Sequence, residues 1–187
     1  MIRAFIAVTL AESVIEEIAK IRSALQETRA DVRWTRLEGL HLTLKFLGDL
    51  DRNRIEPVLE VLRETAHGGR PLQVTAQGMG AFPNSRRPRT VWVGLHGQGL
   101  AALNAELENA LMSLDFPPDA REFTPHLTLG RVRSLRGWER MLPVMKAHEQ
   151  TVFGESTIHY MTLYRSDLRP EGAVYTRLGA AAFQPGP

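Results

Sequence analysis

His41-Leu42-Thr43-Leu44 recurs as His126-Leu127-Thr128-Leu129, an identical segment in the second half of the chain. Both copies lie in apolar stretches that are typical of β-strands. Alternate side chains of a strand leave on opposite faces, so each histidine shares a face with its threonine while the leucines occupy the other face. A single copy would indicate little. The repetition predicts a paired polar site on an apolar support.

The composition is that of an ordinary globular protein. The chain has 187 residues, of which 43% are apolar and 24% charged, with a formal net charge of +2 and no cysteine. The missing cysteine excludes disulfides, thiolate catalysis and cysteine-bound zinc. No apolar run approaches the roughly 20 residues of a membrane helix, and acidic residues follow the apolar start, so residues 2–8 read as a strand and not as an export signal. We therefore expect a cytoplasmic protein that does not contact membranes.

Arginine is concentrated locally although the whole chain is nearly neutral. The groups are Arg86, Arg87 and Arg89, then Arg131, Arg133 and Arg136, then Arg165 and Arg169. Local positive patches on such a protein favour one focused anionic ligand over a long polyanion.

Hydrophobic periodicity predicts an alternation of strands and helices. Strands are expected at 2–8, at the first motif up to Leu47, and at 72–76, 90–95, 123–132, 151–153, 158–164 and 173–178; helices are expected at 12–28, after Asp51, at 100–114 and at 138–147. Residues 13–16 have the Ser-x-x-Glu form of a capping box. Asp51 is expected to cap the second helix and Gly68-Gly69 to end it. Gly48 is expected to end the first motif strand, and residues 167–172 to form a turn.

The two halves of the chain match in element order: strand, helix, His-Leu-Thr-Leu strand, helix, strand. The loop at 78–88 is expected to be the junction between them. The sequence thus predicts an α+β fold in which residues 1–187 form a single bilobal domain. Each of two pseudo-symmetric lobes would have an antiparallel sheet with helices outside, and a central cleft would carry the motifs at 41–44 and 126–129.

A pair of histidines across a cleft can divide acid–base catalysis, because one can accept a proton while the other donates one. Thr43 and Thr128 could donate hydrogen bonds to phosphate oxygens. No close group of His, Asp and Glu indicates a metal site, and no Gly-Lys pair supports a Walker A motif. The residues favour metal-independent opening of a strained phosphodiester, and leave open which histidine is the acid. The other histidines, His67, His96, His148 and His159, are expected to be structural or on the surface.

The chain is similar to the 2H phosphoesterase superfamily, and within it resembles the RNA 2′,3′-cyclic phosphodiesterases, first described as 2′-5′ RNA ligases. The resemblance covers nearly the whole chain, and its residues are Trp34, the segment 41–48 (His-Leu-Thr-Leu-Lys-Phe-Leu-Gly), Phe82-Pro83, Arg87-Pro88, the segment 123–131 (Phe-Thr-Pro-His-Leu-Thr-Leu-Gly-Arg) and the segment 163–166 (Leu-Tyr-Arg-Ser). It implies a bilobal fold and hydrolysis of a terminal 2′,3′-cyclic phosphate on RNA to a 2′-phosphate, without metal or nucleotide cofactor. The implied partners are RNA ends of this kind, including tRNA fragments, or cyclic nucleotides. We expect the protein to be a monomer.

The resemblance also implies roles for individual residues. His41 would donate a proton to the departing 3′ oxygen, His126 would activate water, and Thr43 and Thr128 would hold the phosphate. Arg131 would act beside the phosphate, although strand alternation alone points it to the opposite face unless Gly130 forms a bulge.

Further residues have expected positions. Alternation places Lys45 on the motif face, at the cleft or its solvated rim, and Phe46 in the core. Trp34, Phe82 and Tyr164 are candidates for stacking on a nucleobase.

Three other interpretations compete with hydrolysis. Residues 97–102 fit the Gly-x-Gly-x-x-Ala pattern of a dinucleotide site, but Glu122 precedes the next strand instead of ending it, so we expect only a tight turn. A non-catalytic module could bind RNA ends. The reverse reaction, ATP-independent 2′-5′ joining, would use the same groups.

Overall fold

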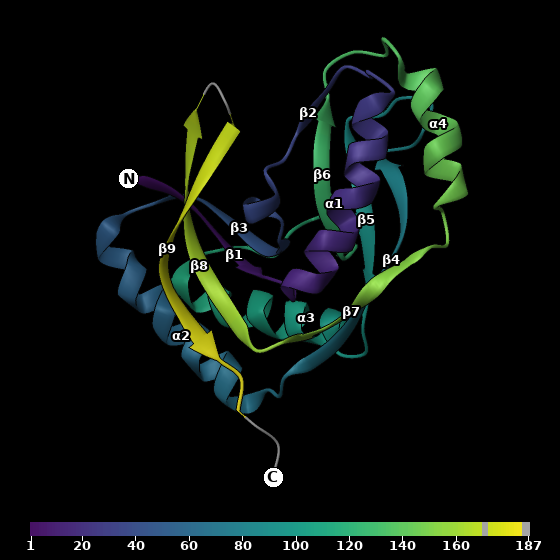
Figure 1. The fold of residues 1–187 in the computed structure, drawn as a ribbon. Coiled ribbons are helices and arrows are strands. Elements are labelled where there is room, and N and C mark those ends of the chain that lie inside the picture. The colour runs from purple at the N-terminus through teal and green to yellow at the C-terminus, as the bar shows by residue number, and fades with distance from the viewer. Residues whose placement is uncertain (170–171, 185–187) are drawn as a thin grey trace.

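The computed structural model describes residues 1–169 and 172–184, in which nine strands form one curled antiparallel sheet with four α-helices packed on it (Figure 1). The strands are β1 (Ile2–Val8), β2 (Val32–Trp34), β3 (Leu42–Leu50), β4 (Leu72–Phe82), β5 (Thr90–His96), β6 (His126–Val132), β7 (Val152–Ile158), β8 (Tyr160–Arg169) and β9 (Gly172–Ala182). The helices are α1 (Glu12–Glu27), α2 (Ile55–Gly68), α3 (Leu100–Leu111) and α4 (Trp138–Ala147), with short 3-10 turns η1 (Leu37–Gly39), η2 (Arg52–Arg54) and η3 (Met112–Leu114). The predicted α+β class is confirmed.

The sheet has two halves that meet at one residue pair. The strand order is β7-β4-β5-β6-β3-β1-β8-β9, with β2 paired to β6, and the pairing of β3 with β6 runs through Leu42 and Leu127. We call β3, β1, β8 and β9 the β3 half, and β6, β5, β4, β7 and β2 the β6 half. The chain passes between them repeatedly, and α1, which follows β1, packs against β7 and α4. The halves of the sheet therefore do not correspond to halves of the sequence.

The predicted junction at 78–88 is accordingly wrong. Residues 78–82 belong to β4, and both β4 and β5 lie in the β6 half. Gly78 is irregular within the strand, with φ of +72°, and the part of the segment that does connect two elements is 83–89, between β4 and β5.

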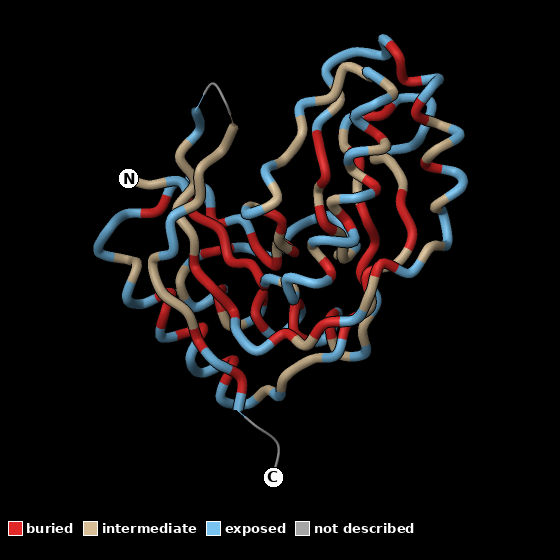
Figure 2. Tube along the Cα trace, in the orientation of Figure 1, coloured by how far each residue is buried: buried red, intermediate tan, exposed pale blue. Residues whose placement is uncertain are grey.

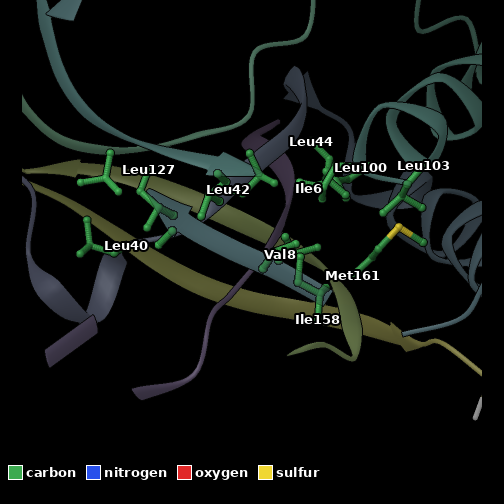
Figure 3. Close-up of a cluster of buried hydrophobic side chains, with 14 of the residues drawn as sticks. Ile6, Val8, Leu40, Leu42, Leu44, Leu100, Leu103, Leu127, Ile158 and Met161 are labelled. Atoms are coloured by element: carbon green, nitrogen blue, oxygen red, sulfur yellow. The ribbon is translucent and has the colours of Figure 1, made fainter. Parts of the chain in front are cut away.

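The core lies between one face of the sheet and the helices. Figure 2 shows buried residues along the middle of the strands. Figure 3 shows that Ile6, Leu42, Leu100, Leu127 and Met161, from five different elements, belong to one buried cluster. The helical stripe Val14, Ile18, Ile21 and Leu25 is buried as its spacing predicts. Because the helices cover one face, polar chemistry is left to the other face. No helix in the described ranges combines the length and the apolar character needed to cross a membrane.

Several predicted boundaries need correction. The N-cap of α1 is Ala11, whose backbone N–H donates to Ser156 Oγ, so Ser13 and Glu16 form no capping box. Asp51 precedes η2 and makes no side-chain cap, while α2 ends at Gly68 as predicted. Gly48 does not end β3, because its left-handed conformation is accommodated as a bulge opposite β1.

Other boundaries differ by a few residues. The second motif strand begins at the histidine and not at residue 123, and the last strands are longer than predicted. Of the predicted turn at 167–172, residues 167–169 belong to β8 and residue 172 to β9, while residues 170–171 lie outside the described residues. Residues 97–99 link β5 to α3, and β5 is antiparallel to β6, so they form a tight turn and not a dinucleotide-binding βαβ unit.

Candidate active site

The two motifs lie side by side where the halves of the sheet meet. Leu42 and Leu127 pair directly and are 1% and 0% exposed, so their side chains belong to the core. An antiparallel register through this pair places each histidine next to the threonine of the other motif, on the face that turns away from the core. The charge of His126 acts on the pKa of His41, which agrees with this proximity.

The ring of His41, just before β3, is held through both nitrogens. Nδ1 lies 2.7 Å from the carbonyl oxygen of Gly39. Because a carbonyl only accepts, Nδ1 carries a proton, and in the neutral ring Nε2 is the basic nitrogen. Nε2 lies 3.1 Å from the hydroxyl of Thr43. Phe5 stacks on the ring at 4.8 Å and Tyr175 meets it edge-on at 5.1 Å, so the ring has one defined orientation.

His126, the first residue of β6, is held in a similar way. Its Nδ1 lies 2.7 Å from the carbonyl oxygen of Thr124, which again assigns the proton to Nδ1. Phe82 packs edge-on against this ring, with 4.9 Å between the ring centroids, and it also packs against the Trp92 ring at 5.1 Å. A Cβ on Gly80 would lie 2.4 Å from the Trp92 ring, so this packing requires glycine there. The same backbone bond thus fixes the tautomer in both motifs.

Burial lowers the pKa of both imidazoles below its usual value near 6.5. For His41 the backbone bond to Gly39 opposes this effect and the charge of His126 adds to it. For His126 the bond to Thr124 opposes it and the Arg131 guanidinium adds to it. Both rings are consequently neutral at pH 7 in the free protein, and a bound anion would favour their protonation.

Arg131 reaches the same face as His126 because of a bulge. In the pairing of β5 with β6, Trp92 lies opposite Thr128 and Val91 lies opposite Gly130, so Leu129 is an extra residue. The extra residue reverses the alternation, which returns Arg131 to the motif face. Its charge acts on His126 and also on Tyr175, which stands against His41. The anticipated bulge is thus present.

The first motif carries an equivalent bulge that the sequence analysis missed. β1 pairs Ala7 with Thr43 but Ile6 with Lys45, so Leu44 is the extra residue. Lys45 therefore turns to the helix side, where it is 3% exposed and bonds to Glu108 at 2.8 Å, to Asp119 at 3.0 Å and to a backbone carbonyl at 2.7 Å. The prediction that Lys45 shares the motif face is wrong.

The predicted position of Phe46 is also wrong, in the opposite direction to that of Lys45. It was expected in the core, yet it is 57% exposed and lies 6.1 Å from Phe5, the residue that stacks on His41. Counted from the histidine, Phe46 in the first motif occupies the position of Arg131 in the second. After each bulge, one motif therefore presents an aromatic ring and the other a cation.

The three aromatic residues proposed for stacking have different positions. Phe82 touches His126 directly. The Tyr164 ring stacks on Phe5 at 5.4 Å, and its centroid lies 6.5 Å from that of the His41 ring. Trp34 is half-buried on β2 opposite Gly130.

Phe5 and Tyr175, which hold His41, were missed. Phe5 reads as an ordinary apolar residue of the first strand, and Tyr175 lies far away in the sequence. No local pattern points to either residue.

The remaining histidines lie outside this site where their contacts are defined. His148 bonds to the Thr151 hydroxyl at the end of α4, and His159 lies beside Tyr160. Across residues 1–169 and 172–184, no three His, Asp or Glu side chains come together in a way that could hold a metal ion.

Comparison with known proteins agrees with this geometry. A family model described as LigT-like phosphoesterase matches residues 8–92 and 94–175. The chain belongs to the LigT-like phosphoesterase family. Both His-Leu-Thr-Leu segments lie inside the matched ranges.

Individual relatives of this LigT-like phosphoesterase cover nearly its full length. The RNA 2′,3′-cyclic phosphodiesterase of Methanothermobacter thermautotrophicus is 32% identical over 94% of this chain and 95% of its own. The crystal structure of TT0787 of Thermus thermophilus superposes with a TM-score of 0.82 at 26% identity, covering 98% of both chains. E. coli LigT complexed with 3′-AMP shares the fold, with a TM-score of 0.77 at 24% identity over 97% of this chain and 98% of its own.

Proposed function

We propose that this LigT-like phosphoesterase hydrolyses the terminal 2′,3′-cyclic phosphate of RNA to a 2′-phosphate, without a metal ion. The observation that carries the proposal is the pair of imidazoles, each with Nδ1–H held by a backbone carbonyl, which leaves Nε2 of each ring as the nitrogen that exchanges protons. The activity named for the archaeal relative supports the same substrate class.

In the proposed reaction the two rings act on opposite sides of phosphorus. Nε2 of His126 takes a proton from water, and the water oxygen forms a bond to phosphorus. The bond from phosphorus to O3′ breaks, and Nε2–H of His41 gives its proton to O3′. The product carries a 2′-phosphate and a 3′-hydroxyl, and the two histidines have exchanged protonation states. The assignment of His126 as the base and His41 as the acid follows the resemblance to the superfamily.

The surroundings of the two rings support these roles. The guanidinium of Arg131 lowers the pKa of His126, which favours the neutral form that a base needs. His41 must instead be protonated, and the anionic phosphate supplies the charge that raises its pKa on binding. In the free protein this protonation is disfavoured by burial.

The remaining groups would bind the substrate. We assign Thr43, Thr128 and Arg131 to the phosphate oxygens, and Phe82 to a nucleobase, with Trp34 and Tyr164 as further stacking candidates. The halves of the sheet would act as the two lobes of the predicted cleft, with the substrate over their junction. Action as a cytoplasmic monomer stays a prediction.

The test is end-group analysis of an oligoribonucleotide with a 2′,3′-cyclic phosphate, incubated with the protein and EDTA. We expect a 2′-phosphate end, and no product with the double variant H41A/H126A. Recovery of the intact cyclic end would mean that the protein is at most an RNA-end-binding module. A 3′-phosphate product would contradict the assigned leaving group. Joined strands in the presence of a second RNA with a 5′-hydroxyl would indicate the reverse, 2′-5′ joining reaction.

A further inference from the structure

A cavity lies next to the histidine pair without including it. Its volume is about 640 Å³, and it is lined by β2, η1, α1 and β9 through Arg22, Trp34, Arg36, Glu38, Gly39 and Tyr175, among others. Two of these residues also hold His41: Gly39 accepts the bond from Nδ1, and Tyr175 packs edge-on against the ring. The cavity therefore adjoins the site at His41, because the residues that hold this ring also line the cavity.

The orientation of His41 sets how far a group in the cavity lies from phosphorus. Nδ1 faces Gly39, on the cavity side, whereas Nε2 faces Thr43. At Gly39, therefore, the wall of the cavity lies on the side of the imidazole ring opposite to Nε2. The cavity is consequently displaced from the position of the phosphate, and it suits a neighbouring part of the substrate.

The cavity offers the contacts that a nucleotide needs. Trp34 and Tyr175 supply aromatic rings, on which bases of any sequence can stack. Arg22 bonds to the Thr35 carbonyl oxygen, while its buried Nε has no hydrogen-bond partner. The exposed Arg36 adds a second cation, and Glu38, whose charge acts on Arg22, adds an acceptor for a base amino group or a ribose hydroxyl.

We propose that this cavity binds the nucleotide on the 5′ side of the one that carries the cyclic phosphate. The inference rests on the proposed function, because an RNA that ends in a cyclic phosphate continues only in the 5′ direction. The base would stack on Trp34 or Tyr175, and the phosphate linking the two nucleotides would meet Arg22 and Arg36. Substrates of two or more nucleotides are then favoured over a mononucleoside 2′,3′-cyclic phosphate.

The test compares kcat/KM for three substrates with the same terminal nucleoside: a cyclic mononucleotide, the dinucleotide, and a dinucleotide that lacks the penultimate base. For the wild type we expect the dinucleotide to exceed the other two by about tenfold. Trp34→Leu and Arg36→Gln should each reduce this preference severalfold. Arg52→Gln, which removes an exposed arginine remote from the cavity, should retain it.

Equal kcat/KM for the mononucleotide and the dinucleotide would overturn the proposal. A preference that both cavity variants retain would overturn it as well, as would an equal loss on both substrates, which would place the terminal nucleoside in the cavity. Arg36 is exposed, so its variant keeps the test valid if Trp34→Leu fails to fold.

A binding measurement separates this proposal from the proposed function. Calorimetry with a dinucleotide that ends in a 2′-phosphate should show weaker binding to Arg36→Gln than to Arg52→Gln. If the wild type hydrolyses none of the substrates but shows this difference, the cavity assignment stands and the proposed hydrolysis fails. If the substrates are hydrolysed and the two variants bind the dinucleotide equally, the proposed hydrolysis stands and the cavity assignment fails.

Discussion

At His41 and His126, burial disfavours the charged imidazole, so both pKa values lie below 6.5 in the free protein. The proposed reaction needs one neutral and one protonated ring. We therefore expect a bell-shaped profile of kcat/KM with its maximum below about pH 6.5, since this profile reports the free enzyme. The profile of kcat should be displaced to higher pH, because the bound phosphate raises both pKa values. A kcat maximum at or below that of kcat/KM would contradict this.

Removal of either ring should abolish most of the turnover. We expect H41A and H126A each to lower kcat on the order of 10²–10⁴-fold, the usual contribution of general acid–base catalysis. Rates are to be measured on the cyclic dinucleotide, with circular dichroism to verify the fold. An unchanged rate in either variant would refute the paired roles.

Arg131 gives a prediction with a definite sign. Burial lowers the pKa of His126 and the charge of Arg131 lowers it further, so Arg131→Gln should raise that pKa and move the acidic limb of the kcat/KM profile to higher pH. KM should also rise if the guanidinium binds phosphate. Arg133→Gln, an exposed arginine two residues further on, is the matched control and should leave the limb in place. An identical profile in both variants would argue against the role given to Arg131.

Phe46 was predicted to be buried by strand alternation, but it is exposed in the structure. A core position would make Phe46→Ala cost about 3–5 kcal/mol. At 57% exposure we expect the free energy of unfolding to change by less than about 1 kcal/mol in urea titrations. The alternation that predicted burial is correct up to Leu44. It fails afterwards because the motif itself gives no sign of an inserted residue.

At the scale of elements, Lys45 joins β3 to α3 and to the segment that leads into the second motif. It bonds to Glu108 and Asp119, and that segment continues to Thr124, which holds His126. Lys45→Met leaves the buried Glu108 carboxylate without its cation. We expect a loss of about 3–5 kcal/mol in the free energy of unfolding.

Chemical denaturation measures this loss, and Lys20→Met is the control. Lys20 forms an exposed ion pair with Glu17, so its removal should cost less than about 0.5 kcal/mol. Replacing Glu108 as well, in K45M/E108L, should recover most of the loss. Equal stability of the two single variants would mean that the buried ion pair contributes nothing.

The elements themselves were largely predictable, for a physical reason. The stripe of α1 and the leucine spacing of α3 are local patterns, and the structure buries both. Partners of elements are not local. That α1 packs against β7, and that Tyr175 from β9 supports His41, depends on how the sheet curls, which periodicity does not encode.

At the scale of the whole molecule, the two halves of the sheet carry different chromophores. The tryptophans Trp34, Trp92 and Trp138 lie on β2, β5 and α4, with the β6 half, and the tyrosines Tyr160, Tyr164 and Tyr175 lie on β8 and β9, in the β3 half. Because the chain crosses repeatedly between the halves, we expect one cooperative unfolding transition. Tryptophan fluorescence and tyrosine difference absorbance should give the same urea midpoint. Separate midpoints would show that the halves unfold independently.

That the two motifs form one site was predictable from their repetition. Which residues of the two motifs are neighbours was not. Identical segments indicate one shared site, but only the sheet register places each histidine next to the other threonine. The cavity beside Gly39 and Tyr175 likewise assembles from four elements, and of its lining residues only Trp34 was expected to bind a nucleobase.

The Leu42–Leu127 bridge also determines what this protein could be made to accept. The pair sets the register of the two motif strands where the halves of the sheet meet, and its side chains lie in the core. Exchanging these leucines for bulkier or slimmer side chains should change the distance between the two strands, and with it the size of the ester that fits, at a cost in stability.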